Sequence, residues 1–173
     1  ANFGGYNRQV SIPHSHFQKS YIQNLWNARN KFSQFQITIE ATHHGPTALK
    51  KPTLFIEIGT TEKEWNDVNL CNSVAQIIIN EMEKTPKSYP VAICFGGTHY
   101  PEKFTNELIH GEYSLGTVIP KHALEQIDQS LFSHIIQRNK GATAALLDWN
   151  SMGKNKQRIL EMLKETELEV IRL

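Results

Sequence analysis

The sequence contains little of what marks the specialised classes of protein. It has two cysteines, Cys71 and Cys94, in 173 residues, which are too few for a disulfide framework. No apolar run approaches the roughly 20 residues that a membrane helix needs. The charge is balanced, with 18 Lys and Arg against 17 Asp and Glu, so a strongly basic coat for nucleic acid is excluded, whereas a local basic patch is not. We expect a soluble, cytoplasmic protein from a reducing compartment.

The composition that remains is that of one folded domain. Hydrophobic residues make up 39% and charged residues 20%, which is enough apolar surface for a core and too little charge for disorder. No repeat and no change in composition divides the chain, so we expect a single domain over residues 1–173. The chain opens without Met on residues 1–7, a stretch rich in Gly and Asn. We therefore expect a fragment of a longer protein.

Hydrophobic periodicity alternates between strand and helix spacing along the chain. We expect strands at residues 35–40, 54–58, 90–95, 113–119, 143–147 and 168–173. We expect helices at residues 17–26, 62–84, 101–109, 123–138 and 156–164. Alternation of this kind predicts an α/β fold, a mainly parallel central sheet with helices on both faces.

Three of the expected strands end in polar loops that contain glycine. The loops are residues 40–47 (Glu-Ala-Thr-His-His-Gly-Pro-Thr), 57–65 (Glu-Ile-Gly-Thr-Thr-Glu-Lys-Glu-Trp) and 95–101 (Phe-Gly-Gly-Thr-His-Tyr-Pro). Ligands of open parallel sheets bind beyond the carboxyl ends of the strands. We therefore expect the ionisable side chains of these loops to converge on one pocket, namely His43, His44, His99, Glu57 and Glu62.

Each loop also has a purely structural explanation. Thr61 followed by Glu64 fits a helix capping box, Gly96 and Gly97 are typical of a turn, and a lone histidine after a strand is commonly just hydrogen-bonded. A further basic group is a candidate phosphate contact, although its charge pattern favours a solvated face. It consists of Arg138, Lys140, Lys154, Lys156 and Arg158.

Taken together, these motifs resemble the archaeal and plant type of D-aminoacyl-tRNA deacylase. The resemblance is carried by residues 40–47, 57–65 and 96–105, and by the shorter segments 119–121 (Ile-Pro-Lys) and 147–149 (Leu-Asp-Trp). It covers most of the chain, and several long motifs in the right order are far more specific than one. Family members are typically longer, with a strand–helix–strand segment before the point where this chain begins. The resemblance thus implies the larger, C-terminal part of such a protein.

The resemblance also implies a fold like that of peptidyl-tRNA hydrolases and nucleoside phosphorylases, and an activity. The activity is hydrolysis of the ester between a D-amino acid and the terminal adenosine of tRNA, with zinc as cofactor. The expected partner is tRNA charged with a D-amino acid, and the chain is expected to be a monomer or to associate with the missing N-terminal segment.

This chemistry requires an attacking water, a stabilised oxyanion and a proton for the leaving group, and zinc with an open position supplies an acidified water. The candidate metal ligands are His43, His44, Glu57 and His99. The other candidate catalytic residues are Glu62, as a ligand or general base, and Thr60, Thr61 and Thr98, which could orient the substrate. The candidate substrate contacts are Gly96 and Gly97, whose N–H groups could face the oxyanion, and Tyr100 and Lys121, the latter for a tRNA phosphate.

Three alternatives stay open at this point. Hydrolysis could proceed without metal, assisted by the ribose 2′-hydroxyl, with His99 or His44 in a positioning role. The same pocket could serve a small-molecule hydrolase or a nucleoside phosphorylase-like enzyme, which would need no basic rim. The domain could also bind without catalysis, in which case the His99 ring should lie more than about 10 Å from His43 and His44, beyond what side chains bridge between neighbouring strands.

Overall fold

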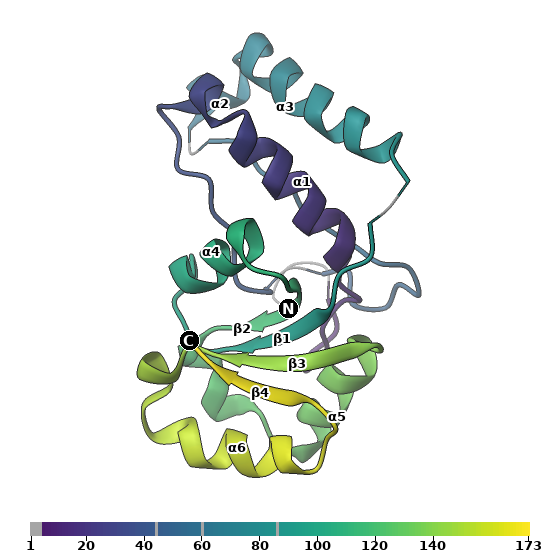
Figure 1. Ribbon diagram of the computed structural model, residues 1–173, viewed down its shortest axis with the longest axis vertical. Coiled ribbons are helices and arrows are strands. Elements are labelled where there is room, and N and C mark those ends of the chain that lie inside the picture. The colour runs from purple at the N-terminus through teal and green to yellow at the C-terminus, as the bar shows by residue number, and fades with distance from the viewer. Residues whose placement is uncertain (1–4, 44, 60, 86) are drawn as a thin grey trace.

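The computed structural model describes residues 5–43, 45–59, 61–85 and 87–173. Its centre is a parallel sheet of four strands in the order β2-β1-β3-β4 (Figure 1). The strands are β1 (Val91–Phe95), β2 (Ser114–Ile119), β3 (Ala142–Leu147) and β4 (Glu169–Arg172). Phe95 is in register with Ile119 on one side and Leu147 on the other. The carboxyl ends therefore meet at one edge, and the predicted α/β fold is confirmed.

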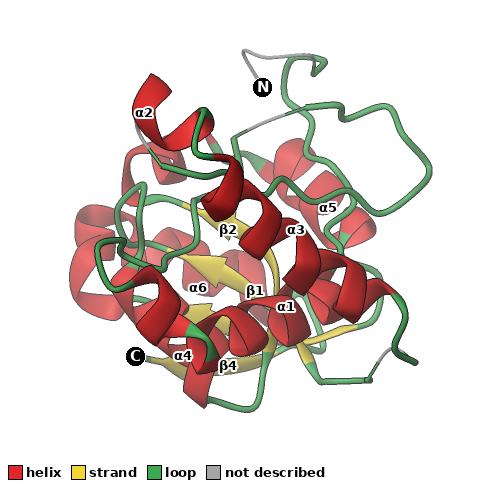
Figure 2. Cartoon of the chain, turned by 90° about the horizontal axis from the view of Figure 1, so that it is seen from above, coloured by secondary structure: helices red, strands yellow, loops and turns green. Residues whose placement is uncertain are grey.

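Helices cover both faces of this sheet. On one face lie α1 (Ser15–Asn27) and α4 (Glu102–His110), and on the other lie α5 (Gln129–Arg138) and α6 (Lys156–Lys164) (Figures 1 and 2). Side chains of β1 alternate between two buried clusters, with Ala92 and Cys94 in the first and Ile93 and Phe95 in the second. All four are fully buried, as expected for a central strand that reads as a continuous apolar run.

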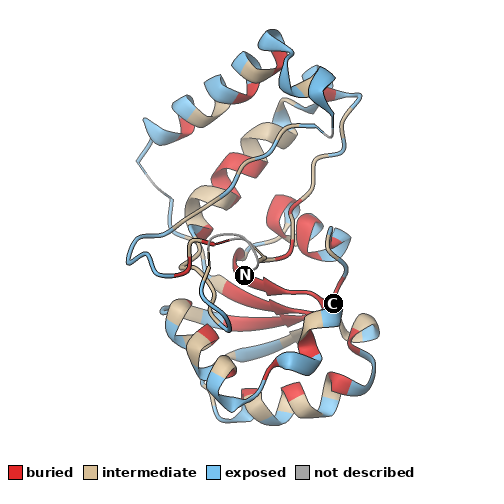
Figure 3. Ribbon diagram, turned by 180° about the vertical axis from the view of Figure 1, so that it is seen from behind, coloured by how far each residue is buried: buried red, intermediate tan, exposed pale blue. Residues whose placement is uncertain are grey.

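Two further helices, α2 (Glu62–Trp65) and α3 (Val68–Met82), lie beyond α1, away from the sheet. A small third buried cluster, formed by Phe32, Leu70 and Val74, packs α3 against the segment that follows α1. The outer side of α3 is exposed (Figure 3), and the exposed side chains of this helix include the apolar Val68, Ile79 and Met82. Short 3₁₀ helices occur at η1 (Arg29–Phe32), η2 (Lys121–Gln126) and η3 (Trp149–Asn155). Within the described ranges, no helix is both long enough and apolar enough to span a bilayer.

One buried lysine connects α1 to the C-terminal end of α4. Lys19 of α1 is 1% exposed, and its ammonium donates to the carbonyl oxygens of Leu108, Gly111 and Tyr113, at 3.1, 2.9 and 2.8 Å. A cation suits the carbonyl-rich end of a helix. Burial lowers the pKa of Lys19, against the opposing charges of Glu107 and Glu112. The contact fixes α1 against the end of α4.

Two of the predicted strands, at 35–40 and 54–58, are wrong: both segments run without the ladder of a named strand. Alternating apolar residues make a chain extended, but a ladder also needs a neighbouring backbone to pair with. At 54–58 the alternation is visible in the burial, because Ile56 and Ile58 pack on the third cluster while Phe55 is 51% exposed.

Two predicted helices are also each split in two, for the same physical reason. The helix expected at 62–84 is α2 followed by α3, and the helix expected at 123–138 is η2 followed by α5. In both cases an aspartate caps the second helix. Asp67 accepts hydrogen bonds from the N–H groups of Asn69 and Leu70, and Asp128 accepts one from Leu131. An N-cap carboxylate starts a new helix at such a position, whereas the apolar periodicity alone predicts one continuous helix.

The segment around residues 38–43 lies along the outer edge of β2. The N–H of Ala41 donates to the carbonyl of His99 and that of Thr42 to the carbonyl of Val118, both at 2.8 Å. In return the Val118 N–H donates to the Thr42 hydroxyl at 3.0 Å. The segment thus occupies the place of a fifth strand through a few specific contacts.

We predict that Thr42→Val lowers the free energy of unfolding by about 1–3 kcal/mol, because the buried N–H of Val118 loses its acceptor while the side-chain shape is kept. Val118 is 2% exposed. Thr143→Val, at an exposed position of β3, is the control and should change it by no more than about 0.5 kcal/mol. Denaturant unfolding of both variants measures this, and equal stabilities would contradict the role given to Thr42.

Candidate metal and catalytic site

The loop after β1 brings His99 to the carboxyl edge of the sheet. Gly96 and Gly97 follow Phe95 with φ angles of +105° and +77°, a backbone region that residues with a Cβ rarely adopt. A Cβ at Gly97 would lie 2.9 Å from the Cβ of Pro101, so glycine is also needed for space. The turn directs the chain back over the strand ends, where the His99 carbonyl accepts the hydrogen bond from Ala41.

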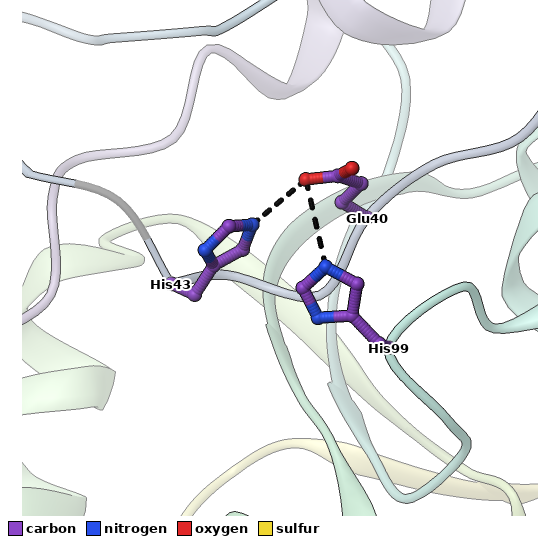
Figure 4. A group of neighbouring side chains, drawn as sticks. All are labelled: Glu40, His43 and His99. Carbon is purple, nitrogen blue, oxygen red and sulfur yellow. Dashed lines mark hydrogen bonds and ion pairs between the residues drawn. The ribbon is translucent and has the colours of Figure 1, made fainter. Parts of the chain in front are cut away.

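Three side chains meet at this point: Glu40, His43 and His99 (Figure 4). Nε2 of His43 lies 2.7 Å from Oε2 of Glu40, and Nε2 of His99 lies 3.8 Å from the same oxygen. The two imidazole centroids are 4.6 Å apart. One potential ligand atom from each residue lies within 4.8 Å of the others. The side chains are 28–42% exposed, so the cluster is open to an incoming substrate.

Glu40 is the electrostatic centre of the cluster. Partial burial raises its pKa, but hydrogen bonds from His43 and Tyr100 and the nearby imidazoles outweigh this, so the net pKa lies below the ordinary value of 4.5. The same hydrogen bond to Glu40, with the charges of Glu40 and Glu57, raises the pKa of the Tyr100 phenol. Tyr100 also packs edge-on against His99, with centroids 4.8 Å apart. At neutral pH the cluster therefore holds a carboxylate surrounded by donors.

The structure brings His43 and His99 together, as the strand ends suggested, but the neighbouring carboxylate differs from the expected one. Glu40 occupies the position that was expected for Glu57, which is exposed and does not belong to the group within 4.8 Å. Glu57 is still close enough for its charge to act on Tyr100. His44, the alternative to His43, lies outside the described residues.

The threonine and glutamate candidates of the 57–65 loop serve a helix start. The carboxylate of Glu64 accepts from the N–H and the hydroxyl of Thr61, at 3.0 and 2.6 Å, which is the contact that a capping box predicts. Glu62 is exposed in the first turn of α2, and Thr60 lies outside the described residues. In the other loop, the Thr98 hydroxyl donates to the carbonyl of Tyr100 at 2.7 Å. For Thr61 and Thr98 the structure therefore provides a local explanation.

The backbone donors expected to face an oxyanion are used within the protein. The N–H of Gly96 donates to the carbonyl of Ile119 at 2.9 Å, and that of Gly97 donates to the hydroxyl of Ser151 at 2.6 Å. These bonds join the β1 loop to the ends of β2 and β3. Lys121 follows β2, with its N–H bonded to the Gly97 carbonyl and its side chain exposed.

Sequence reasoning missed the supports on the β3 side of the loop. Asp148, directly after β3, forms an ion pair of 2.9 Å with Lys103 of α4, and its carbonyl accepts from the Ser151 hydroxyl that also bonds Gly97. The Leu-Asp-Trp segment was noted only for its resemblance. Hollows of about 770 and 540 Å³ lie along β4. The Glu40–His43–His99 cluster is an open surface site, because its side chains are 28–42% exposed.

Comparison with known proteins identifies the relatives of this chain. A family model described as D-aminoacyl-tRNA deacylase matches residues 1–171. A D-aminoacyl-tRNA deacylase of Cenarchaeum symbiosum is 54% identical over 171 residues, which are 99% of this chain and 66% of the relative. One of Methanosarcina mazei is 33% identical over 175 residues, 99% of this chain and 57% of the relative. The chain therefore spans less than two thirds of these curated relatives.

A solved structure has the same fold. It is a crystal structure described as a conserved protein of unknown function, AF0625, and it superposes with a TM-score of 0.92 at 27% sequence identity. The match covers 99% of this chain and 61% of that one. The arrangement of elements around the site is thus shared with a longer protein.

We predict that Glu40→Gln changes the acid limb of stability in metal-free protein. The pKa of Glu40 is depressed by folding, so its contribution is present above pH 4.5 and is lost as the pH falls through the folded-state pKa. Glu40→Gln removes this contribution, and its unfolding free energy should fall less steeply than that of the parent below pH 4.5. Urea unfolding at a series of pH values with a chelator present measures the slopes. The exposed Glu167→Gln is the control, and identical slopes for all three proteins would contradict the assignment.

Proposed function

The chain belongs to the D-aminoacyl-tRNA deacylase family, and we propose that it hydrolyses the ester between a D-amino acid and the terminal adenosine of tRNA at the Glu40–His43–His99 cluster. The observation that carries this proposal is the cluster itself: two imidazoles and a carboxylate within 4.8 Å at the carboxyl edge of the sheet, where ligands of such folds bind. Family membership favours an aminoacyl-tRNA over a free small molecule as the substrate.

The donor set fits zinc. Catalytic zinc sites use three His, Asp or Glu ligands and keep a fourth position open, and bonds of about 2.1 Å in a tetrahedron separate the ligand atoms by about 3.4 Å. The two distances to Oε2 of Glu40, 2.7 and 3.8 Å, bracket that separation. Glu40, His43 and His99 would hold the ion, which supplies Lewis acidity and brings the pKa of water toward about 7.

The residues of the cluster also set the protonation state of the site. Nε2 of both histidines faces Oε2 of Glu40, so a ligating histidine must carry its proton on Nδ1. An ion and the Nε2 proton of His43 compete for the same space. Binding of the ion would therefore displace that proton. Tyr100 donates to Glu40 and keeps the carboxylate oriented.

A hydrolysis without metal is the second candidate, because the 2.7 Å contact between His43 and Glu40 is already a complete carboxylate–imidazole pair. Such a pair fixes the tautomer and orientation of the ring, and the imidazole can act as the base that accepts a proton from water or from the ribose 2′-hydroxyl. In this version His99 positions the substrate. Removal of metal separates the two candidates.

We predict that this chain releases tyrosine from D-tyrosyl-tRNA at least about tenfold faster than from L-tyrosyl-tRNA, a ratio that needs about 1.4 kcal/mol of transition-state discrimination. Release of labelled amino acid measures both rates. A chelator should abolish the release and added zinc should restore it. Equal hydrolysis of the two substrates would reject the D-specific assignment, and full activity of metal-free protein would reject zinc in favour of the second candidate.

We predict that His99→Ala lowers the hydrolysis rate by about 100-fold or more, the usual range for losing a group that acts on the reacting atoms. Its stability should change little, because the side chain is 42% exposed. Zinc content measured by atomic absorption should fall with the activity. His110→Ala is the matched control, because His110 is exposed at the end of α4, where its ring packs edge-on against Trp26. A His99→Ala protein with unchanged turnover and zinc content would contradict the site.

A further inference from the structure

Three cationic side chains lie along the carboxyl edge of the sheet, beside the proposed catalytic cluster. Lys121 follows β2, and its backbone is bonded to Gly97, two residues before His99. Arg172 is the last residue of β4, in register with Leu147 at the end of β3. Lys156 is the first residue of α6. We call Lys121, Lys156 and Arg172 the basic strip.

Trp149 holds two members of the strip in place. It follows β3 by two residues, and the guanidinium carbon of Arg172 lies 4.0 Å from its ring centre, with Nζ of Lys156 at 5.0 Å. The face of an aromatic ring attracts cations without neutralising them. An ion pair with a carboxylate would cancel the charge, so this arrangement orients two cations and leaves their charge available to a ligand.

The lack of carboxylate partners distinguishes the strip from neighbouring lysines. Lys103 is paired with Asp148 at 2.9 Å, and Lys154 with Glu125 at 2.7 Å. Within the part of the chain that the structure describes, Lys121, Lys156 and Arg172 form no ion pair with an acidic side chain. Lys121 and Arg172 are exposed and Lys156 is half-buried.

The strand order gives the strip its direction. In the order β2-β1-β3-β4, Lys121 lies at the β2 end, and Trp149 with its two cations lies at the β3–β4 end. Three strand spacings of about 4.8 Å make roughly 14 Å. The Glu40–His43–His99 cluster lies at the β2–β1 end of the same edge, because its backbone segments are hydrogen-bonded to each other and to Val118 of β2. A chain of phosphates attached to an ester in the cluster would therefore pass along the strip.

We propose that the basic strip binds phosphates of the single-stranded 3′ end of tRNA, which places the esterified terminal nucleoside in the cluster. This inference rests on the proposed function, because it takes the ester site as its starting point. Single strands bind to grooves and edges that combine cations with aromatic side chains. The net charge of the chain is only +1, so contact with RNA must come from a local set of cations such as this one.

Binding of uncharged RNA tests the strip without any requirement for hydrolysis. The probe is a fluorescent RNA hairpin with a single-stranded CCA 3′ end, followed by anisotropy over a range of salt concentrations. Lys156→Gln with Arg172→Gln should weaken binding about tenfold. The plot of log Kd against log salt should flatten by about 1.4, since each phosphate contact of a single strand contributes about 0.7.

The control variant makes the same change of charge elsewhere. Lys31→Gln with Lys87→Gln removes two exposed lysines, one in η1 and one between α3 and β1, and should bind as the parent does. Arg172→Lys keeps the charge while it alters the packing on Trp149. It should keep most of the affinity if the charge binds phosphate, and should lose it if Arg172 acts only as a structural contact.

The outcomes separate the strip from the proposed function. Parent-like binding by the Gln variant, equal losses in the control, or no RNA binding by the parent at low salt would each overturn the strip. Equal binding of a poly-glutamate peptide would assign it to acidic protein segments and overturn it as well. RNA binding that depends on the strip, together with no hydrolysis of D-tyrosyl-tRNA, would support the strip and reject the deacylase activity of this chain.

Discussion

The candidate site depends on three hydrogen bonds, which join Ala41 and Thr42 to His99 and Val118. These bonds position the side chains of the Glu40–His43–His99 cluster. They attach an extended segment, which is not part of the ladder, to the outer edge of β2. Because Glu40 and His43 flank the two bonded residues, the attachment delivers both side chains to the loop that carries His99. The sheet provides the edge, and these three hydrogen bonds bring the side chains of the site together at it.

A single carboxylate then determines the behaviour of the cluster. Glu40 accepts hydrogen bonds from His43 and Tyr100 and faces His99, so several neighbouring groups stabilise its negative charge. A proton or a metal ion between the carboxylate and the imidazoles satisfies the same atoms. The two proposed hydrolytic mechanisms therefore differ in what lies between Glu40 and the two imidazoles, a proton or a metal ion.

Sequence patterns predicted the sheet well, and the site only in part. The apolar runs at β1 and β3 are buried on both faces, and short continuous apolar runs bounded by turn residues indicate such strands. The convergence of His43 and His99 was anticipated from the strand-end rule, although residues 35–40 are not a ladder strand; an extended segment at the sheet edge was sufficient. Glu40 was missed because its three-residue spacing from His43 becomes meaningful only when the chain bends after Ala41. Glu57 was expected because it lies late in the predicted strand at 54–58, and that segment is not a strand of the sheet.

The openness of the site fits the size of the proposed substrate. A small molecule needs an enclosing pocket to bury most of its surface, whereas the two imidazoles here are a third or more exposed. A tRNA brings its own binding energy through phosphates remote from the ester, and remote contacts of this kind can supply the positioning that a shallow site lacks. Trp149 holds Arg172 and Lys156 at the β3–β4 end of the same edge. These two cations lie about three strand spacings from the β2 end, where they can contact phosphates remote from the ester. The cluster and the strip therefore lie along the same carboxyl edge of a single parallel sheet, which fixes the position of one relative to the other.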